Sequence, residues 1–239
     1  MSQRNVLIFV NSARAEAKSA SETIISRLND ENIKVYLSTD SSIPAVELVL
    51  VLGGDGTILR GAEYAVAHNV PLLGINLGHV GFMAEVEAFT YEDVAEAVIN
   101  KDYVSDERML LSFEVKRKGS IIESGWALNE VSIERKSTTM VELFVQIDNR
   151  PLSRWGCDGI ICATPTGSTA YAFSAGGPVL WPEVQALVLL PIAAHALFAK
   201  PMVIAPSSTI GIDIESSDAS LSADALRKIE LKKGDEIAI

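Results

Sequence analysis

The sequence predicts a chain of two domains, an α/β domain with a parallel sheet over residues 1–105 and a β-rich domain over residues 106–239. Strand and helix signals alternate strictly in the first part, and such alternation requires crossover connections between parallel strands. After about residue 105 the strand signals follow one another directly. The 239 residues suit two small domains, and 48% hydrophobic residues suffice for packed cores.

The first strand is expected at residues 6–10, a wholly apolar run of the kind that is buried on both faces of a sheet. Residues 48–52, Leu-Val-Leu-Val-Leu, predict a second strand of this kind. Ligands bind at the carboxyl ends of the strands in such sheets. The other elements expected in this domain are helices at 13–28, 57–68 and 91–100 and strands at 34–37 and 71–75.

The second domain is expected to consist mainly of strands. The stretch from residue 202 to the end is rich in strand signals, and residues 221–239 are expected to form a terminal hairpin with its turn at residues 232–235. Before them, alternating or continuous apolar residues predict strands at 110–117, 120–124, 127–135, 140–147 and 159–163.

Composition excludes several classes of protein. Twenty Lys and Arg against 31 Asp and Glu give a net charge of −11, which argues against broad nucleic-acid binding but permits one local site for a small anion. The two cysteines, Cys157 and Cys162, cannot form a disulfide framework. No signal-peptide pattern and no uninterrupted apolar span is present, so we expect a cytoplasmic protein that does not bind membranes.

The first candidate site is the loop at residues 53–57, Gly-Gly-Asp-Gly-Thr, between the apolar strand and a predicted helix. Glycines allow close approach of a ligand and positive φ angles, and the helix N-terminus favours a phosphate. Asp55 would repel a phosphate but is well placed to take a proton from a hydroxyl beside it. The alternative is a tight turn in which Asp55 caps the helix.

The second candidate site is the block at residues 164–178, rich in hydroxyl groups and glycines, which follows a strand that carries Asp158-Gly159. Backbone amides and hydroxyls there could bind a polar ligand, and Tyr171 could stack on a flat ring. A polar loop leading into a helix is the alternative. Asn129-Glu130, inside a predicted strand, is a weaker third candidate that a solvated edge would also explain.

Several familiar motifs are absent. The sequence contains neither a Walker P-loop nor a Gly-x-Gly-x-x-Gly fingerprint. His68, His79 and His195 are scattered and do not form a zinc motif, so no protein-held metal is expected. The two cysteines lie in an apolar strand and are expected in the core.

Taken together, these segments resemble NAD kinase, the ATP- or polyphosphate-dependent enzyme that makes NADP. The resemblance covers nearly the whole chain and is greatest to actinobacterial members, because of residues 126–130 and 173–182. It implies an N-terminal Rossmann-like α/β domain and a C-terminal β-sandwich that binds NAD. The matching segments are residues 53–57, 77–82, 129–130, 158–159, 164–178 and 194–201.

The resemblance also implies roles for individual residues. Asp55 would be the general base for the 2′-hydroxyl of the adenosine ribose, and Gly56 would hold nucleotide phosphates. Mg²⁺ would arrive with ATP, and the protein would be a homodimer or homotetramer. The residues implied to bind or line the NAD site, or to lie beside it, are Arg60, Phe82, Asn129, Glu130, Asp158, Thr169, Ala170, Tyr171, Ala172, Phe173 and Ser174.

The sequence departs from the family pattern near its end. Ala225 stands where an Asp-Gly pair would place glycine after Asp224. Family members continue beyond the position of Ile239 with a further strand and a closing helix, so a shortened C-terminal end is expected.

Two other functions remain open from the residues. A lipid or sugar kinase could share the Gly-Gly-Asp-Gly loop, although the block around Tyr171 argues against it. A non-catalytic dinucleotide sensor is the other alternative, in which the altered tail has removed turnover.

Overall fold

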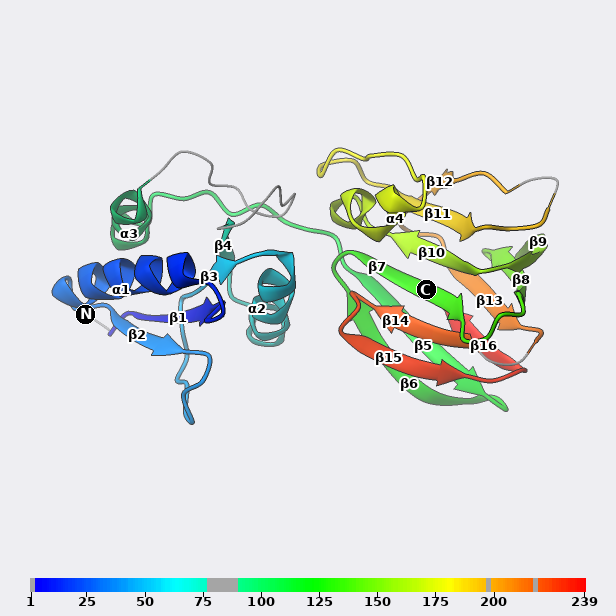
Figure 1. Ribbon diagram of the computed structural model, residues 1–239, viewed down its shortest axis with the longest axis horizontal. Coiled ribbons are helices and arrows are strands. Elements are labelled where there is room, and N and C mark those ends of the chain that lie inside the picture. Colours follow the sequence, from blue (N-terminus) through cyan, green and yellow to red (C-terminus); the bar gives the residue numbers. More distant parts are fainter. Residues whose placement is uncertain (1–2, 77–89, 197–198, 217–218) are drawn as a thin grey trace. The chain divides into compact units, whose positions relative to one another are not determined.

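The computed structural model describes residues 3–76, 90–196, 199–216 and 219–239 of the chain (Figure 1). They form two compact units, Met1–Glu107 and Arg108–Ile239. Among the described residues, no helix is long and apolar enough to cross a membrane.

The first unit is a four-stranded parallel sheet of order β2-β1-β3-β4 with helices on both faces. Side chains of α1 and α3 pack on one face, and those of α2 pack on the other. The elements are β1 (Asn5–Val10), α1 (Ala15–Asp30), β2 (Lys34–Leu37), β3 (Leu48–Gly53), α2 (Asp55–His68), β4 (Leu72–Asn76) and α3 (Tyr91–Asn100).

Strand β3 is the centre of this unit, and all six of its residues are buried. Helices cover both faces of the sheet, so a strand inside it must be apolar on both sides. Gly61 of α2 lies against β3, where an added Cβ would come within 2.5 Å of the Val51 side chain. Helix α3 begins at a capping box, in which Thr90 and Asp93 satisfy each other's backbone N–H groups.

The second unit contains two six-stranded sheets, of orders β12-β11-β10-β7-β14-β15 and β6-β5-β16-β13-β8-β9, and neighbouring strands within each sheet pair antiparallel. The elements are β5 (Leu111–Arg117), β6 (Ser120–Ala127), β7 (Glu130–Arg135), β8 (Val141–Ile147), β9 (Arg150–Cys157), β10 (Gly159–Ala163), a 3₁₀ turn η1 (Thr166–Thr169), α4 (Tyr171–Ser174), β11 (Leu187–Ile192), β12 (Met202–Ile204), β13 (Ile210–Ile214), β14 (Ala219–Ala223), β15 (Arg227–Leu231) and β16 (Asp235–Ala238).

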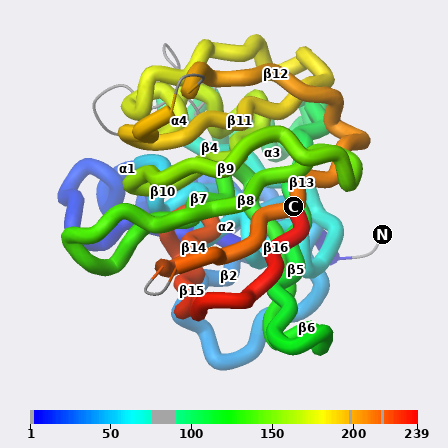
Figure 2. The backbone as a smooth tube through the Cα atoms, turned by 90° about the vertical axis from the view of Figure 1, so that its right-hand side faces the viewer, coloured from blue at the N-terminus to red at the C-terminus, as the bar shows by residue number. Residues whose placement is uncertain are grey.

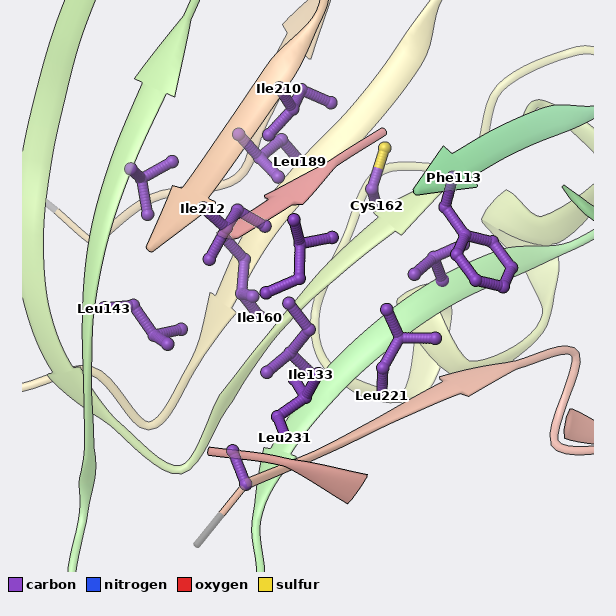
Figure 3. Close-up of a cluster of buried hydrophobic side chains, with 14 of the residues drawn as sticks. Phe113, Ile133, Leu143, Ile160, Cys162, Leu189, Ile210, Ile212, Leu221 and Leu231 are labelled. Atoms are coloured by element: carbon purple, nitrogen blue, oxygen red, sulfur yellow. The ribbon is translucent and has the colours of Figure 1, made fainter. Parts of the chain in front are cut away.

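One apolar core fills the space between these two sheets. Figure 3 shows Ile133 and Ile160 of one sheet with Leu143 and Ile212 of the other in a single cluster. Strands such as β5, β8, β13 and β14 contribute every second residue to this core, as a sandwich requires. The predicted fold class, an α/β domain followed by a β-sandwich, is confirmed.

The predicted terminal hairpin is wrong. Strand β15 pairs with β14, whereas β16 crosses to the other sheet and lies between β13 and β5 (Figure 2). The buried Asp235 carboxylate accepts two hydrogen bonds from Arg117 of β5, at 2.8 and 2.7 Å, which fixes the last strand there. The buried Asp235 carboxylate needs a positively charged partner. This partner, Arg117, is 118 positions away in the sequence, so local patterns do not indicate it.

The true hairpin joins β14 to β15 through Asp224, Ala225 and Leu226, and the first two of these have φ angles of 52° and 56°. Two consecutive positive φ values are the pattern of a type I′ turn, in which glycine is favoured at the second position. The departure from the family pattern at Ala225 therefore falls at a strained position.

We expect Ala225→Gly to raise the free energy of unfolding by about 0.5–1 kcal/mol, because alanine is disfavoured in the left-handed region. Urea denaturation measures the change. Asn149→Gly is the matched control, since Asn149 has a φ of 61° in the β8–β9 turn and asparagine tolerates this conformation better. Equal effects of the two substitutions would contradict the assignment of strain to Ala225.

Candidate functional site

In the first unit, the Gly-Gly-Asp-Gly-Thr loop connects β3 directly to α2. Gly53 is required by packing, because an added Cβ would lie 2.7 Å from Thr57 Oγ1. At Gly54 and Gly56 an added Cβ would meet no atom within 4 Å. The predicted positive φ angles are wrong here, since Gly54 has a φ of −91° and neither Gly53 nor Gly56 has a positive value. Gly54 and Gly56 therefore leave open space beside the backbone.

Asp55 is the first residue of α2, and Gly54 occupies the capping position. The alternative interpretation of Asp55 as the helix cap is therefore wrong. Its side chain is exposed, yet the surrounding protein displaces enough water to raise the pKa of its carboxyl above the ordinary value. Arg60 is exposed one turn further along α2. Phe82, the other site residue predicted near this unit, lies outside the described residues.

In the second unit, three connections meet at one end of neighbouring strands β10, β7 and β14. Ala163 at the end of β10 pairs with Glu130 at the start of β7, and Ala223 at the end of β14 pairs with Val131. The residues before β7, the block after β10 and the turn after β14 are thereby brought together. Sequence analysis did not predict that the turn at Asp224 belongs to this group.

Asn129 and Glu130 are both buried, with exposed fractions of 5% and 8%. Asn129 Oδ1 and Glu130 Oε2 are buried without a hydrogen-bond partner among the described residues. Burial raises the pKa of Glu130 to about 7; the Asp224 carboxylate adds to this rise, and the Tyr171 backbone N–H opposes it. Buried polar atoms are normally satisfied, so these two acceptors are suited to a ligand. The alternative of a solvated edge is wrong.

The block after β10 packs tightly against the residue pair before β7. The Thr164 hydroxyl donates to the Leu128 carbonyl at 2.6 Å, and the Thr164 N–H donates to the Asn129 carbonyl at 2.9 Å. An added Cβ on Gly167 would lie 2.0 Å from that same Asn129 carbonyl oxygen. Glycine at position 167 is therefore a requirement of close approach.

The rest of the block forms η1 and α4. Tyr171 is half-buried, and its hydroxyl lies 3.3 Å from Glu134 Oε2 of β7. Burial raises the pKa of Tyr171, and the nearby Glu134 carboxylate is the second largest cause of this rise. Of the other predicted residues, Thr169 and Ala170 are half-buried, Ala172 is buried in an apolar cluster with β10 and β11, and Phe173 and Ser174 are exposed.

Asp158 lies at the other end of β10, directly before Gly159. Its carboxylate accepts a hydrogen bond from Arg135 Nε at 2.6 Å, and its carbonyl accepts the Arg135 N–H. Gly159 pairs with Glu134, the residue that Tyr171 contacts. Tyr171 thus extends along β7 from Glu130 toward Glu134. The sequence could have indicated Glu134, which is four residues from Glu130 and therefore on the same face of a strand.

The second unit therefore brings together most of the predicted binding residues, whereas Asp55, Gly56 and Arg60 belong to the first unit. Carboxylates and an amide oxygen are acceptors for the hydroxyl and amino groups of a nucleoside. Open backbone at the start of a helix suits a phosphate. Among the described residues, no group of three or more His, Cys, Asp or Glu side chains is arranged to hold a metal ion.

The open glycine loop at a helix start and the two buried acceptors without a partner among the described residues are features that suit a phosphate and a nucleoside. Family comparison agrees: residues 40–103 match the ATP-NAD kinase N-terminal domain, and residues 128–239 match the ATP-NAD kinase C-terminal domain. The chain belongs to the NAD kinase family, whose members are kinases that phosphorylate NAD. The predicted resemblance to actinobacterial members is also confirmed.

Among curated relatives, NAD kinase 2 of Streptomyces avermitilis is 48% identical over 89% of this chain and 71% of its own length. The NAD kinase of Thermobifida fusca is 50% identical over 81% of this chain and 61% of its own length. Among solved structures, yeast NADH kinase complexed with NADH has a TM-score of 0.85 at 30% identity, covering 98% of this chain and 79% of that one. An NAD kinase from Archaeoglobus fulgidus in complex with ATP has a TM-score of 0.75 at 26% identity, covering 98% and 89%.

The raised pKa of Glu130 makes a prediction about stability. Because the folded-state pKa of about 7 exceeds the ordinary value of 4.5, the folded chain binds this proton more tightly than the unfolded chain. The stabilisation is complete below the ordinary value and is lost as the pH rises through about 7. Glu130→Gln should remove this loss, so that the Tm of the variant rises relative to that of the original chain between pH 5 and pH 8.

Thermal unfolding across this pH range measures the difference, with Glu123→Gln on the exposed part of β6 as the control. The control should follow the original chain at every pH. A Glu130→Gln curve parallel to the original would mean that this carboxyl is not buried with a raised pKa.

Proposed function

We propose that the chain transfers the γ-phosphoryl group of ATP, supplied with Mg²⁺, to the 2′-hydroxyl of the adenosine ribose of NAD, giving NADP. A polyphosphate is the alternative donor. The observation that carries the proposal is the pair of buried acceptors without a partner, Asn129 Oδ1 and Glu130 Oε2, in a chain of this family. We propose Met1–Glu107 as the Rossmann-like domain and Arg108–Ile239 as the NAD-binding domain.

Asp55 is proposed as the general base. The ribose O2′ forms a bond to the γ-phosphorus, the bond from that phosphorus to the β,γ-bridging oxygen breaks, and the O2′ proton goes to the Asp55 carboxylate. ADP then leaves with the electron pair of the broken bond. The raised pKa of Asp55 makes it a stronger base than an ordinary aspartate. Proton transfer is late in such a reaction, so the carboxylate also orients the hydroxyl.

Gly56 and Arg60 are proposed to act on the phosphates. The open backbone beside Gly56 can approach a phosphate, and the first turn of α2 carries unpaired N–H groups and the positive end of the helix dipole. Arg60 offers a counter-charge from the same helix. Mg²⁺ is proposed to arrive with ATP and to offset the charge of the triphosphate, as it does in most kinases.

The second unit is proposed to hold NAD by its polar groups and one aromatic ring. The dinucleotide has amino, carboxamide and hydroxyl groups. We propose that these groups form hydrogen bonds with the carboxyls of Glu130 and Asp158 and with the side-chain amide of Asn129. The Tyr171 ring is proposed to lie against a base, since its hydroxyl is already placed by Glu134. The remaining proposed lining residues are Phe82, Thr169, Ala170, Ala172, Phe173 and Ser174.

We further propose a cytoplasmic homodimer or homotetramer that does not act on nucleic acids. Strand β6 lies at the edge of its sheet and presents exposed Ile121 and Ile122, which supports self-association.

The direct test of the proposed function is an assay of the purified chain with NAD, Mg²⁺ and either ATP or polyphosphate. NADP should form with at least one donor. The absence of NADP with both donors would refute the proposed activity.

Asp55→Asn should retain NAD binding and lower the turnover number by roughly 10²–10⁴-fold, because the general base is lost while the shape of the loop is kept. Asp93→Asn is the matched control, since Asp93 is an acid in the first turn of α3 in the same unit. The control should keep near-normal turnover. A similar turnover for Asp55→Asn and the original chain would exclude a role as base.

Tyr171→Ala and Asp158→Ala should each weaken NAD binding by about tenfold and MgATP binding by less than about twofold, because an aromatic face and a carboxylate suit a nucleoside better than a triphosphate. Isothermal titration calorimetry with each nucleotide measures the difference. Asp213→Ala, on β13 of the opposite sheet, serves as the control. Equal losses for the two nucleotides would assign Tyr171 and Asp158 to the scaffold.

A further inference from the structure

The Asp224 carboxylate is bound to the backbone of the segment that carries Asn129 and Glu130. Its side chain is 3% exposed, and it accepts the N–H groups of Leu128 at 2.8 Å, Asn129 at 2.7 Å and Glu130 at 3.3 Å. In return, the Asp224 N–H donates to the Glu130 carbonyl at 3.1 Å. One side chain thus receives three successive donors from a segment more than 90 residues away.

The carbonyl groups of the same segment are fixed from elsewhere. Those of Leu128 and Asn129 accept hydrogen bonds from Thr164, as described above. Asp224 and Thr164 together therefore fix the backbone groups of residues 128–130 on both the donor and the acceptor side. The atoms that stay without a partner among the described residues are side-chain acceptors, Asn129 Oδ1 and Glu130 Oε2. The hydrogen bonds of Asp224 and Thr164 thus go to backbone groups, and these two side-chain atoms can still accept hydrogen bonds from a ligand.

A carboxylate is a costly choice at this position if its only role is to form a turn. Burial raises the pKa of Asp224, and the neighbouring Glu130 is a second buried carboxyl. The three backbone N–H groups and Arg227 lower it again. Asparagine adopts the same left-handed conformation but offers only one acceptor oxygen. Three converging donors require two acceptor oxygens, and aspartate supplies them.

We propose that Asp224 is a positioning residue for NAD binding, whose carboxylate holds the backbone of residues 128–130 so that the Asn129 and Glu130 side chains face the dinucleotide. The inference rests on the proposed function and extends it to a residue that does not itself touch the substrate. Asp224 acts through its neighbours, so its loss changes the affinity for NAD and not the chemistry of transfer.

The chain contains a matched control for the purely structural role. Asp148 is also the first of two residues with positive φ in a hairpin turn, and its carboxylate accepts the Thr209 N–H at 2.9 Å and the Ser208 hydroxyl at 3.1 Å. This second turn joins β8 to β9 in the opposite sheet. Asp148→Asn therefore reproduces the loss of a turn carboxylate without disturbing residues 128–130.

The experiment compares Asp224→Asn with Asp148→Asn, each in the Ala225→Gly background, which supports folding of the turn. Calorimetry gives the Kd for NAD, steady-state kinetics gives KM for NAD and MgATP and kcat, and thermal unfolding gives Tm. Asp224→Asn should raise the Kd and KM for NAD by about tenfold, the value of one charge-assisted hydrogen bond, with the KM for MgATP and kcat within about twofold. Asp148→Asn should lower Tm without changing the affinity for NAD.

The pH dependence of NAD binding provides a readout that a purely structural role would not change. The groups that act on Glu130 are the Asp224 carboxylate, the Tyr171 N–H and the Tyr171 side chain, whose hydroxyl also contacts Glu134 of β7. Removing the negative charge of Asp224 lowers the pKa of Glu130, so the midpoint of the pH profile should move down in Asp224→Asn and stay unchanged in Asp148→Asn.

An unchanged affinity for NAD in folded Asp224→Asn would overturn the inference. Equal losses for NAD and MgATP that parallel the fall in Tm would also overturn it. Failure of the proposed function is a separate result, since it appears as no NADP formation by the original chain, while calorimetry still reports whether Asp224 governs NAD binding. An original chain that binds no NAD would refute both.

Discussion

The hydrogen bonding of residues 128–130 is the constraint on which the second unit's site depends. A strand that begins beside two others cannot leave its first backbone groups unpaired in a buried position, because each would cost free energy comparable to a lost hydrogen bond. Thr164 satisfies the carbonyl groups and Asp224 satisfies the N–H groups. The strand order β10-β7-β14 puts both partners next to the start of β7. Two side-chain atoms of this short segment, Asn129 Oδ1 and Glu130 Oε2, are left without a partner among the described residues.

The acidic character of the chain bears on which chemical groups of a nucleotide each unit suits. A net charge of −11 is unfavourable for phosphates, and the carboxyls around Tyr171 would repel them further. Those carboxyls are instead good partners for hydroxyl and amino groups, which are the uncharged parts of a dinucleotide. The open glycine backbone at the start of α2 offers a positive helix end in the first unit. The proposed mechanism assigns the phosphates to this end and the nucleoside groups to the second unit.

Much of the fold could be predicted because local patterns specify it. The apolar run of β3 and the strand–helix alternation define the first unit, and residues 53–57 and 164–178 stand out by their glycines. The crossing of β16 to the other sheet could not be predicted, because it depends on the pairing of Asp235 with Arg117, 118 positions away. The role of Asp224 could not be predicted, since its donors lie at residues 128–130 and only the neighbouring Ala225 departs from the family pattern. The φ angles of Gly54 and Gly56 were predicted wrongly, because open space and conformational freedom both favour glycine.

The most direct test of the account is amide hydrogen exchange at residues 128–130 in the NAD-free chain, measured by NMR. The account predicts that the N–H groups of Leu128, Asn129 and Glu130 exchange as slowly as those of Ile133 and Ile161 in the neighbouring strands, because Asp224 binds all three in a buried place. The side chains would then be positioned before any ligand arrives. Exchange at the rate of the exposed turn at Lys118-Gly119 would show that the segment is not fixed in advance, and would contradict the account.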